Sequence, residues 1–550
     1  MISTPFVRLL GSIKGAAQAD IVTGVVQGRR PGISGNATQQ WLSIRRVWHG
    51  DGIHMLQTSA SFRNDLRDCD NSISLSEIIS ALSYALDLTE DAVHGHALRS
   101  CLLGMRIAAE AQLPADQTSS LYFALLLKDV GCSSNASRMG EIVGGDDRPL
   151  KAAVKFEDWT KPHKASVATV KLLWNSVLPD SGAAAQVARI SRIGVSQHRN
   201  NDGMIGLRCH RGANILGKLG MGEAAAEAVR SLDEHWDGSG YPDRLQSEQI
   251  PLLARICAVA QHLDMFSSTR GVDKSIETLR QRSGTWFDPQ LVRVAVSLHR
   301  RGALWANCSP TDSQDDTRRA VLDLDAGKKH QLEAGQIDQI CEAFADVVDA
   351  KSNFTFRHSM GVAEAAFGIA TALHLSADRV QLVRRTALLH DIGKLSVSNS
   401  ILDKNGTLND EEWRSVRLHP GISRSILERV GPFREMAVIA GEHHEKLDGS
   451  GYPKRLMSPD LSIESRIIAV ADAYAALSED RPYRAALDFD EIVSIMTKLV
   501  PYKLDADCFD ALVRTVSINN GLATRPAMDV THTIAAMNAT NATNSVLAFA

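Results

Sequence analysis

The sequence predicts an all-α protein built from two tandem helical domains of one type. Apolar residues recur at helical spacing along most of the chain from Ser74, and the alternating pattern of β-strands is almost absent. The segment Asp-Gly-Ser-Gly-Tyr-Pro occurs twice, at Asp237–Pro242 and at Asp448–Pro453. Its glycines and proline predict a tight turn, and its recurrence predicts two copies of one fold.

Shifts in composition and spacing divide the chain into five segments. Residues 1–70 lack a steady period and are expected to be poorly ordered, and residues 523–550 are expected to form a disordered tail. The first helical domain is expected at 71–311, a polar linker at 312–330 and the second helical domain at 331–522. Each domain is long enough for a core of its own.

The bulk composition narrows the class of protein. A net charge of −4 gives no general affinity for polyanions, so a nucleic-acid polymer is not expected as a partner. The sequence shows no run of 18 apolar residues, no signal peptide and no Cys-x-x-Cys pair among its eight cysteines. We therefore expect a cytoplasmic protein with no membrane segment and with reduced thiols.

The first domain is expected to begin with a helix after Ser74, whose side chain can cap the helix while Glu77 completes a capping box. A second helix begins at His96. The run Leu121–Asp129 is nearly all apolar, which predicts a buried helix. Helical stretches at Ser166–Leu173 and Ala183–Ile193, an apolar run at Pro251–Ala260 and a terminal helix at Phe287–Leu298 follow.

The second domain shows a similar succession of helical stretches. They are expected at Gly335–Val347, His358–Leu373, Val383–His390, Glu411–His419, Ile422–Val430, Met436–His444 and Ile467–Leu477. Gly393 is expected to end the helix that carries His390 and Asp391. Pro420 is expected to mark the end of the helix that precedes it.

Matched spacings align the two domains, and the first domain lacks most of the polar residues of the second. The first domain has different residues at five matched positions: Lys128 for His390, Cys132 for Lys394, Leu232 for His443, Asp233 for His444 and Gln261 for Asp472. His96, Asp129 and His210 are aligned with His358, Asp391 and His419. A cluster that gains a lysine and loses three imidazoles and a carboxylate is a poor metal site. The first domain is expected to keep the fold and lose the chemistry.

The second domain carries a set of side chains that bind metals. They lie on five segments: His358; His390 and Asp391; His419; His443 and His444; and Asp472. A single helical histidine is more often a core residue, but seven such side chains, absent as a set from the first domain, indicate a metal centre. Because a carboxylate beside an imidazole can bridge two ions, we expect two divalent metal ions that share a hydroxide.

Three basic residues are suited to bind phosphate. Lys394 lies one turn beyond Asp391, where it can bind a phosphate oxygen or assist the leaving group. Arg481 and Arg484, three positions apart, can clamp further phosphate charge, although a surface turn could equally carry them. The predicted chemistry is metal-assisted hydrolysis at phosphorus.

The second domain resembles the HD-GYP family, a branch of the HD-domain metal-dependent phosphohydrolases. The residues that carry the resemblance are His358-Ser359, His390–Lys394, His419-Pro420, His443–Glu445, Asp448–Pro453, Asp472–Tyr474 and Arg481–Arg484. They span roughly residues 335–520, and the first domain looks like a degenerate copy.

The resemblance implies a helical HD core with a dinuclear iron or manganese centre. It also implies hydrolysis of cyclic di-GMP to pGpG or GMP. The metal ligands would be His358, His390, Asp391, His419, His443, His444 and Asp472. His390, Asp391 and Lys394 would be catalytic, and Lys394, Arg481, Arg484 and Tyr452 would lie at the substrate.

Two positions depart from the family pattern. Three-metal members carry a Glu four residues before the first histidine, where this chain has Phe354, so two metals are expected. Many members carry an Asp three residues after the last ligand, where this chain has Ala475. That change is expected to slow turnover or alter the choice of substrate.

Two alternatives to a cyclic di-GMP phosphodiesterase remain open. One is an HD phosphohydrolase for another cyclic dinucleotide or a nucleotide, and the other is a weakly active signalling module that binds metal or ligand. The first domain would regulate, bind or dimerise, with a homodimer as the assembly. The Gly-Tyr-Pro surface is a candidate docking site for diguanylate cyclase (GGDEF) domains.

Overall fold

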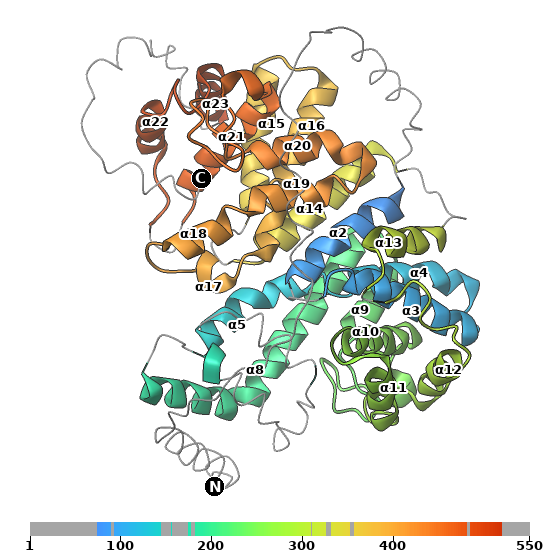
Figure 1. Cartoon of the computed structure of the whole chain (residues 1–550). Coiled ribbons are helices and arrows are strands. Elements are labelled where there is room, and N and C mark those ends of the chain that lie inside the picture. Colours follow the sequence, from blue (N-terminus) through green and yellow to red (C-terminus); the bar gives the residue numbers. More distant parts are fainter. Residues whose placement is uncertain are drawn as a thin grey trace, which may run out of the picture. The chain divides into compact units, whose positions relative to one another are not determined.

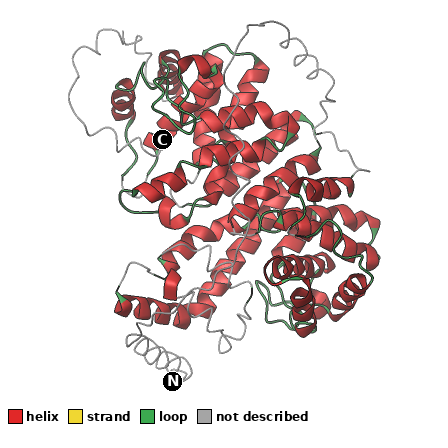
Figure 2. Cartoon of the chain, in the orientation of Figure 1, coloured by secondary structure: helices red, strands yellow, loops and turns green. Residues whose placement is uncertain are grey.

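The computed structural model describes residues 74–89, 93–144, 156, 174–177, 182–309, 311–325, 332–352, 357–480 and 484–519. Among these residues, helices carry the whole fold and no strand forms, apart from isolated bridges between Ser283 and Phe287 and between Asp448 and Met457 (Figure 2). The predicted all-α class is confirmed. The expectations for residues 1–70, 523–550, Ser166–Leu173 and Phe354 concern parts outside the described residues.

The first half of the fold runs from blue to green in Figure 1. Its α-helices are α2 (Leu75–Thr89), α3 (His96–Glu110), α4 (Ala115–Leu127), α5 (Ala136–Val143), α8 (Ala183–Lys218), α9 (Glu223–Arg230), α10 (Leu252–Arg270), α11 (Val272–Gln281) and α12 (Pro289–Arg300). The short 3₁₀ helices η1 (Cys132–Asn135) and η3 (Ser247–Gln249) join them. The apolar run Leu121–Leu127 of α4 is fully buried, as predicted.

The second half repeats this plan. Its α-helices are α14 (Ala334–Asp349), α15 (His358–Ala372), α16 (Ala377–Leu389), α17 (Asn399–Leu402), α18 (Asp410–Val416), α19 (His419–Leu427), α20 (Arg434–Glu442), α21 (Ile463–Ser478), α22 (Phe489–Thr497) and α23 (Ala506–Asn519). The 3₁₀ helices are η4 (Ile392–Ser396), η5 (Gly431–Phe433) and η6 (Ser458–Asp460).

The two halves anchor their first histidine-bearing helix in the same way. Asp87 in α2 accepts a hydrogen bond from the backbone N–H of Ala97 at 3.1 Å. Asp349, at the end of α14, accepts one from the backbone N–H of Ser359, also at 3.1 Å. A buried carboxylate therefore satisfies free N–H groups in the first turn of α3 and of α15, and fixes where each helix begins.

The boundary between the two halves differs from the expected linker. Part of the segment 312–330 forms helix α13 (Gln314–Asp323), which packs on α2 and α3. The segment is polar, but Thr317 and Val321 lie on one face of the helix and are buried. Arg318 donates to Ser80 Oγ at 3.1 Å. An amphipathic helix therefore occupies part of the expected linker.

Helix α2 contacts elements of both halves. All described residues belong to one compact unit, and α2 packs against α3 and α4 as well as η4 and α19. Glu77 of α2 accepts a hydrogen bond from the backbone N–H of Gly431 at 3.3 Å. Arg429 lies over the ring of Tyr84 at 4.1 Å. The boundaries of the two predicted domains stay predictions.

The stretch Glu411–His419, expected as one helix, is divided. Helix α18 ends at Val416, and α19 begins at His419 with Pro420 in its first turn. Proline fits there because the first N–H groups of a helix have no partner within the helix. His419 therefore stands at the start of a helix instead of at the end of one.

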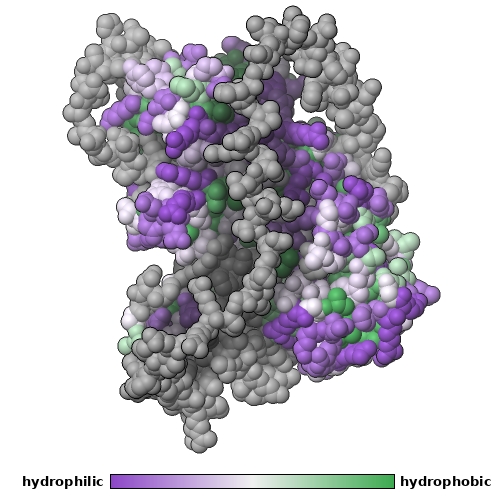
Figure 3. All heavy atoms as spheres, in the orientation of Figure 1, coloured by the Kyte–Doolittle hydropathy of each residue, from purple (hydrophilic) through white to green (hydrophobic). Residues whose placement is uncertain are grey.

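The surface drawn in Figure 3 is mainly hydrophilic where residues are described, with small separate hydrophobic patches. None of the described helices combines the length and the apolar character needed to cross a bilayer.

Candidate metal centre

The structure gathers the seven predicted metal ligands in one cluster of the second half. His358 and His419 begin α15 and α19, His390 and Asp391 follow α16, His443 and His444 follow α20, and Asp472 lies within α21. None of the seven residues is more than 2% exposed. Helix ends and one helix face thus bring side chains from five segments to a single buried point.

Asp391 lies between two groups of histidines. Its Oδ2 is 3.4 Å from His390 Nε2 and 3.7 Å from His358 Nε2. Its Oδ1 is 3.2 Å from His419 Nε2 and 3.7 Å from His443 Nε2. Because each oxygen faces a different group, Asp391 has the arrangement of a carboxylate that bridges two ions.

Asp472 completes the cluster from α21. Its Oδ1 lies 3.2 Å from His358 Nε2 and 3.7 Å from His390 Nε2, and its Oδ2 lies 3.8 Å from His444 Nδ1. Three sets of candidate ligand atoms lie within 4.8 Å of one another: His358, His390 and Asp472; His419, His443 and His444; and His390, Asp391 and His443. These distances suit cation binding by several ligands at once.

Backbone carbonyls orient three of the imidazoles. His390, His419 and His443 each direct Nδ1 at the carbonyl oxygen three residues earlier, at 2.7, 2.7 and 2.6 Å. A carbonyl only accepts, so Nδ1 carries the hydrogen and donates it. The other nitrogen, Nε2, is then unprotonated and faces the cluster with a lone pair, as metal binding requires.

The donor atoms fit a divalent cation. Nε2 of His390, Oδ1 of Asp391 and Nδ1 of His444 are buried and make no hydrogen bond to a described residue. His419 Nε2 and His443 Nε2 lie 3.1 Å apart, although neither carries a hydrogen in the tautomer set by the carbonyls. Buried lone pairs without a donor are costly unless a cation binds them. Imidazole and carboxylate together suit ions such as iron and manganese.

The pKa shifts of two imidazoles and both carboxylates match that reading, whereas at His390 the effect of burial is outweighed by Asp391 and Asp472, which raise its pKa. Burial and the neighbouring imidazoles hold the pKa of His443 and His444 well below the usual value. Burial alone would raise the pKa of Asp391 and Asp472, but the surrounding imidazoles, and for Asp391 also Lys394, hold both well below the usual range. Neutral imidazoles and ionised carboxylates are the forms that bind metals.

Two of the four predicted substrate contacts lie beside the cluster. Lys394 Nζ is 2.5 Å from Asp391 Oδ2, and the Tyr452 ring lies 4.8 Å from the His444 ring. Arg484 donates to the carbonyl of Ala476 at 2.8 Å, and so caps the end of α21. Its contact with substrate stays a prediction. Arg481 lies outside the described residues.

The Gly-Tyr-Pro turn is held by a glutamate to which the sequence reasoning gave no role. Glu445 accepts hydrogen bonds from the backbone N–H of Lys454 at 2.6 Å and of Leu456 at 2.9 Å. Glu234 in the first half accepts the equivalent bond from Asp243 at 2.6 Å. The presence of Glu before both copies of the turn is a sequence signal for this structural role.

The position that matches His419 in the first half is Arg208, not His210. A Cβ on Gly393 would lie 2.1 Å from the carbonyl oxygen of His419, and a Cβ on Gly131 would lie 2.1 Å from that of Arg208. His210 is exposed. Counting positions along the sequence does not identify Arg208, because α8 and the segment before it make this part of the first half longer than its counterpart.

Ion pairs fill the equivalent place in the first half. Lys128 pairs with Asp129, and Arg208 pairs with Asp233. An ammonium and a guanidinium therefore stand beside the carboxylates of the first half, where the second half gathers imidazoles. These cations compensate the carboxylates, and the expected loss of metal chemistry in the first half stays a prediction.

The profile of the HD domain family matches residues 186–291 and 342–508. A relative from Vibrio cholerae serotype O1, 3'3'-cGAMP-specific phosphodiesterase 3, is 38% identical over 82% of this chain and 96% of its own length. The cyclic di-GMP phosphodiesterase response regulator RpfG of Xanthomonas campestris is 37% identical, over 26% of this chain and 39% of its own length.

A solved structure extends the similarity to the fold. The crystal structure of a cyclic GMP-AMP specific phosphodiesterase of V. cholerae aligns with a TM-score of 0.55 and 34% identity. The alignment covers 82% of this chain and 99% of the other. Both halves of the fold, and not the metal cluster alone, therefore have a counterpart. The chain belongs to the HD domain family, and within it to the phosphodiesterases of HD-GYP type.

Proposed function

We propose that the protein hydrolyses a phosphodiester bond of a cyclic dinucleotide at the cluster of the second half, with 3'3'-cGAMP as the substrate. The observation that carries the reaction type is Asp391, whose two oxygens face two groups of buried imidazoles. The choice of substrate is supported by the Vibrio cholerae relative, which matches over 96% of its length and is named for 3'3'-cGAMP.

The first group of ligands would be His358, His390 and Asp472, and the second would be His419, His443 and His444, with Asp391 between them. Two divalent ions, iron or manganese, supply Lewis acidity and a bound water of lowered pKa when present. Five imidazoles and two carboxylates leave an appreciable positive charge on such a pair of ions, which favours binding of a phosphodiester anion.

Lys394 and Tyr452 have separate roles in this proposal. The ammonium of Lys394 lies beside the bridging carboxylate, where it can bind a phosphate oxygen and give a proton to the leaving oxygen. The ring of Tyr452 packs near His444 and offers an aromatic surface to a base. Hydrolysis of one of the two bonds of the ring opens it to a linear dinucleotide.

Cyclic di-GMP is the second candidate substrate. It is favoured by relatives such as the Xanthomonas protein, although their similarity is confined to about a quarter of this chain. Docking of diguanylate cyclase domains on the Gly-Tyr-Pro turn and homodimer formation stay predictions without a supporting contact among the described residues.

Product analysis tests the proposal. The full chain, purified without oxygen and chelator, would be incubated with 3'3'-cGAMP, cyclic di-GMP and cyclic di-AMP, with Asp391→Ala as the inactive control. We expect a linear dinucleotide from 3'3'-cGAMP at the highest kcat/KM, and none from the variant. Faster hydrolysis of cyclic di-GMP would reassign the substrate. Metal-loaded protein that hydrolyses none of the three would contradict the proposed function.

A further inference from the structure

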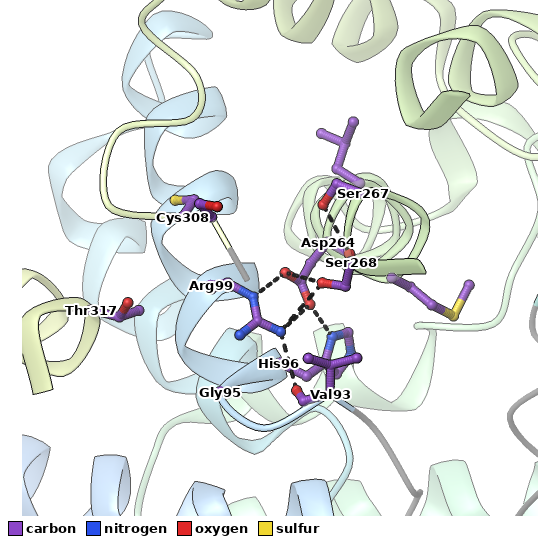
Figure 4. A network of polar contacts seen from close by, with 12 residues as sticks. Val93, Gly95, His96, Arg99, Asp264, Ser267, Ser268, Cys308 and Thr317 are labelled. Carbon is purple, nitrogen blue, oxygen red and sulfur yellow. Dashed lines mark hydrogen bonds and ion pairs between the residues drawn. The ribbon is translucent and has the colours of Figure 1, made fainter. Parts of the chain in front are cut away.

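The first half contains a buried carboxylate that orients its first histidine. Asp264 Oδ2 lies 2.6 Å from His96 Nδ1, and Oδ1 accepts from Arg99 Nε at 2.5 Å (Figure 4). Ser268 Oγ, one turn further along α10, lies 3.4 Å from Asp264 Oδ1. Figure 4 shows the guanidinium and the imidazole converging on this one carboxylate from α3.

The second half differs from the first at three of these positions. By the spacing from the first histidine, Arg99 corresponds to Gly361, and by the spacing from the Gly-Tyr-Pro turn, Asp264 corresponds to Ala475. The same spacing places Glu479 opposite Ser268. The second half thus lacks the Arg–Asp pair and carries a carboxylate one helical turn later on α21.

The new carboxylate reaches the same histidine nitrogen. Glu479 Oε2 lies 3.0 Å from His358 Nδ1, which is the atom that corresponds to His96 Nδ1. A Cβ on Gly361 would lie 3.7 Å from Glu479 Oε1 and 4.0 Å from the Cβ of Ala475. The side chain of Glu479 therefore passes through space next to the two positions that lost their large polar groups.

We propose that Glu479 is the positioning residue of His358 and takes the place of the missing aspartate at Ala475. Its carboxylate accepts the hydrogen of His358 Nδ1, which leaves Nε2 unprotonated and directed at Asp472 Oδ1, 3.2 Å away. This inference rests on the metal centre of the proposed function. The other ring-fixing contacts described above use backbone carbonyls, so at His358 a side chain controls the ligand.

A carboxylate behind an imidazole fixes the ring and increases its basicity, and loss of such a partner lowers metal affinity about 10–100-fold. Accordingly, Ala475 should not by itself weaken the site. The charge of Glu479 also matters, because the neutral amide in Glu479→Gln could still accept a hydrogen bond but would stabilise a charged metal–imidazole unit less.

The test is Mn²⁺ binding to chelator-treated full-length protein, measured by competition with a chelator of known affinity. Glu479→Ala is expected to lower the affinity of one of the two ions about 10–100-fold, and Glu479→Gln to lower it less. The double variant Ala475→Asp/Glu479→Ser places the residues of the first half at two of these three positions and is expected to restore the affinity. Asp480→Asn is the matched control, since the new amide can still accept from Ala486 N.

The outcomes separate this proposal from the proposed function. The role proposed for Glu479 would be overturned if Glu479→Ala bound Mn²⁺ within twofold of the wild-type affinity. It would also be overturned if Glu479→Ala lost affinity and the double variant did not recover it. If Glu479→Ala fails to fold by circular dichroism, the isosteric Glu479→Gln carries the comparison. Weakened metal binding in a protein that hydrolyses no cyclic dinucleotide would contradict the substrate and leave the role of Glu479 standing.

Discussion

At the scale of single residues, Asp391 organises the second half because each of its oxygens faces a separate group of histidines. His390, His419 and His443 hold the lone pair of Nε2 inward because their Nδ1 hydrogens are donated to backbone carbonyls. In the first half, Lys128 pairs with Asp129, the counterpart of Asp391, and Arg208, the counterpart of His419, pairs with Asp233. A buried carboxylate needs a positive partner, and the two halves supply it in different forms.

His390→Ala and Asp391→Ala are each expected to abolish cyclic dinucleotide hydrolysis and to lower bound metal. Asp391→Ala should have the larger effect on metal, because it removes a ligand from both groups, whereas His390→Ala removes one imidazole. Metal analysis of the purified variants beside their turnover checks this. Full metal content in folded Asp391→Ala protein would contradict the bridging role.

Asp129→Ala is expected to leave bound metal and hydrolysis unchanged in the folded protein while lowering stability. It strips a buried lysine of its partner, which typically costs about 3–5 kcal/mol. Replacing both members, as in Lys128→Met/Asp129→Leu, should be close to neutral because neither charge of this pair is left buried without its partner. Urea denaturation and metal analysis check the pair, and metal loss from folded Asp129→Ala would refute the account.

At the scale of elements, the close approach of η4 to α19 holds Lys394 and His419 in place. Gly393 makes this approach possible, since a Cβ there would lie 2.1 Å from the carbonyl oxygen of His419 and 2.8 Å from the backbone nitrogen of Ser423. The first half has the same contact at Gly131. The approach therefore belongs to the fold of both halves, and in the second half it lies beside the candidate metal cluster.

Gly393→Ala is expected to push η4 away from α19 and to lower kcat/KM by about 100-fold, the usual effect of a displacement near 1 Å. Metal affinity should fall as well, because His419 moves with α19. Gly131→Ala, the matched control, should lower stability by a similar amount and leave metal content unchanged. If Gly393→Ala and Gly131→Ala lost equal amounts of metal, the close contact between η4 and α19 would have no specific role in metal binding.

Many of the helices and the ligands of the metal cluster could be predicted from the sequence, because their residue types are informative by themselves. Buried runs such as Leu121–Leu127 are apolar throughout, and adjacent ligands such as His390 and Asp391 are recognisable by type. Arg208 could not be predicted as the counterpart of His419, because the first half has extra residues after Asp129 and the spacing from Asp391 to His419 does not apply there. Glu479 was missed because its function depends on space left by Gly361, which only the packing of α15 on α21 reveals.

At the scale of the whole molecule, both halves lie in one compact unit, and helix α2 of the first half packs against η4 and α19. These two elements carry Lys394 and His419. The first half thus packs directly against elements that carry the cluster of the second half, although its own equivalent positions hold ion pairs. The sequence repeat predicted two similar folds, but the contact between them depends on tertiary packing that no local pattern encodes.

Metal removal is expected to destabilise the whole chain. Free metal at 100 times its Kd stabilises a protein by about 2.7 kcal/mol for each site, so chelation should lower Tm and metal addition should restore it. The shift should vanish in Asp391→Ala and persist in Asp129→Ala. Thermal unfolding with and without Mn²⁺ measures it, and an unchanged wild-type Tm would speak against a metal centre.

The most direct test of the central claim is the number of metal ions bound per chain in wild-type protein purified without oxygen and without chelator. We predict two ions, because the cluster around Asp391 offers two groups of ligands and the first half holds its carboxylates with Lys128 and Arg208. Four ions would show that the first half also binds metal. No metal, even after anaerobic reconstitution, would contradict the account.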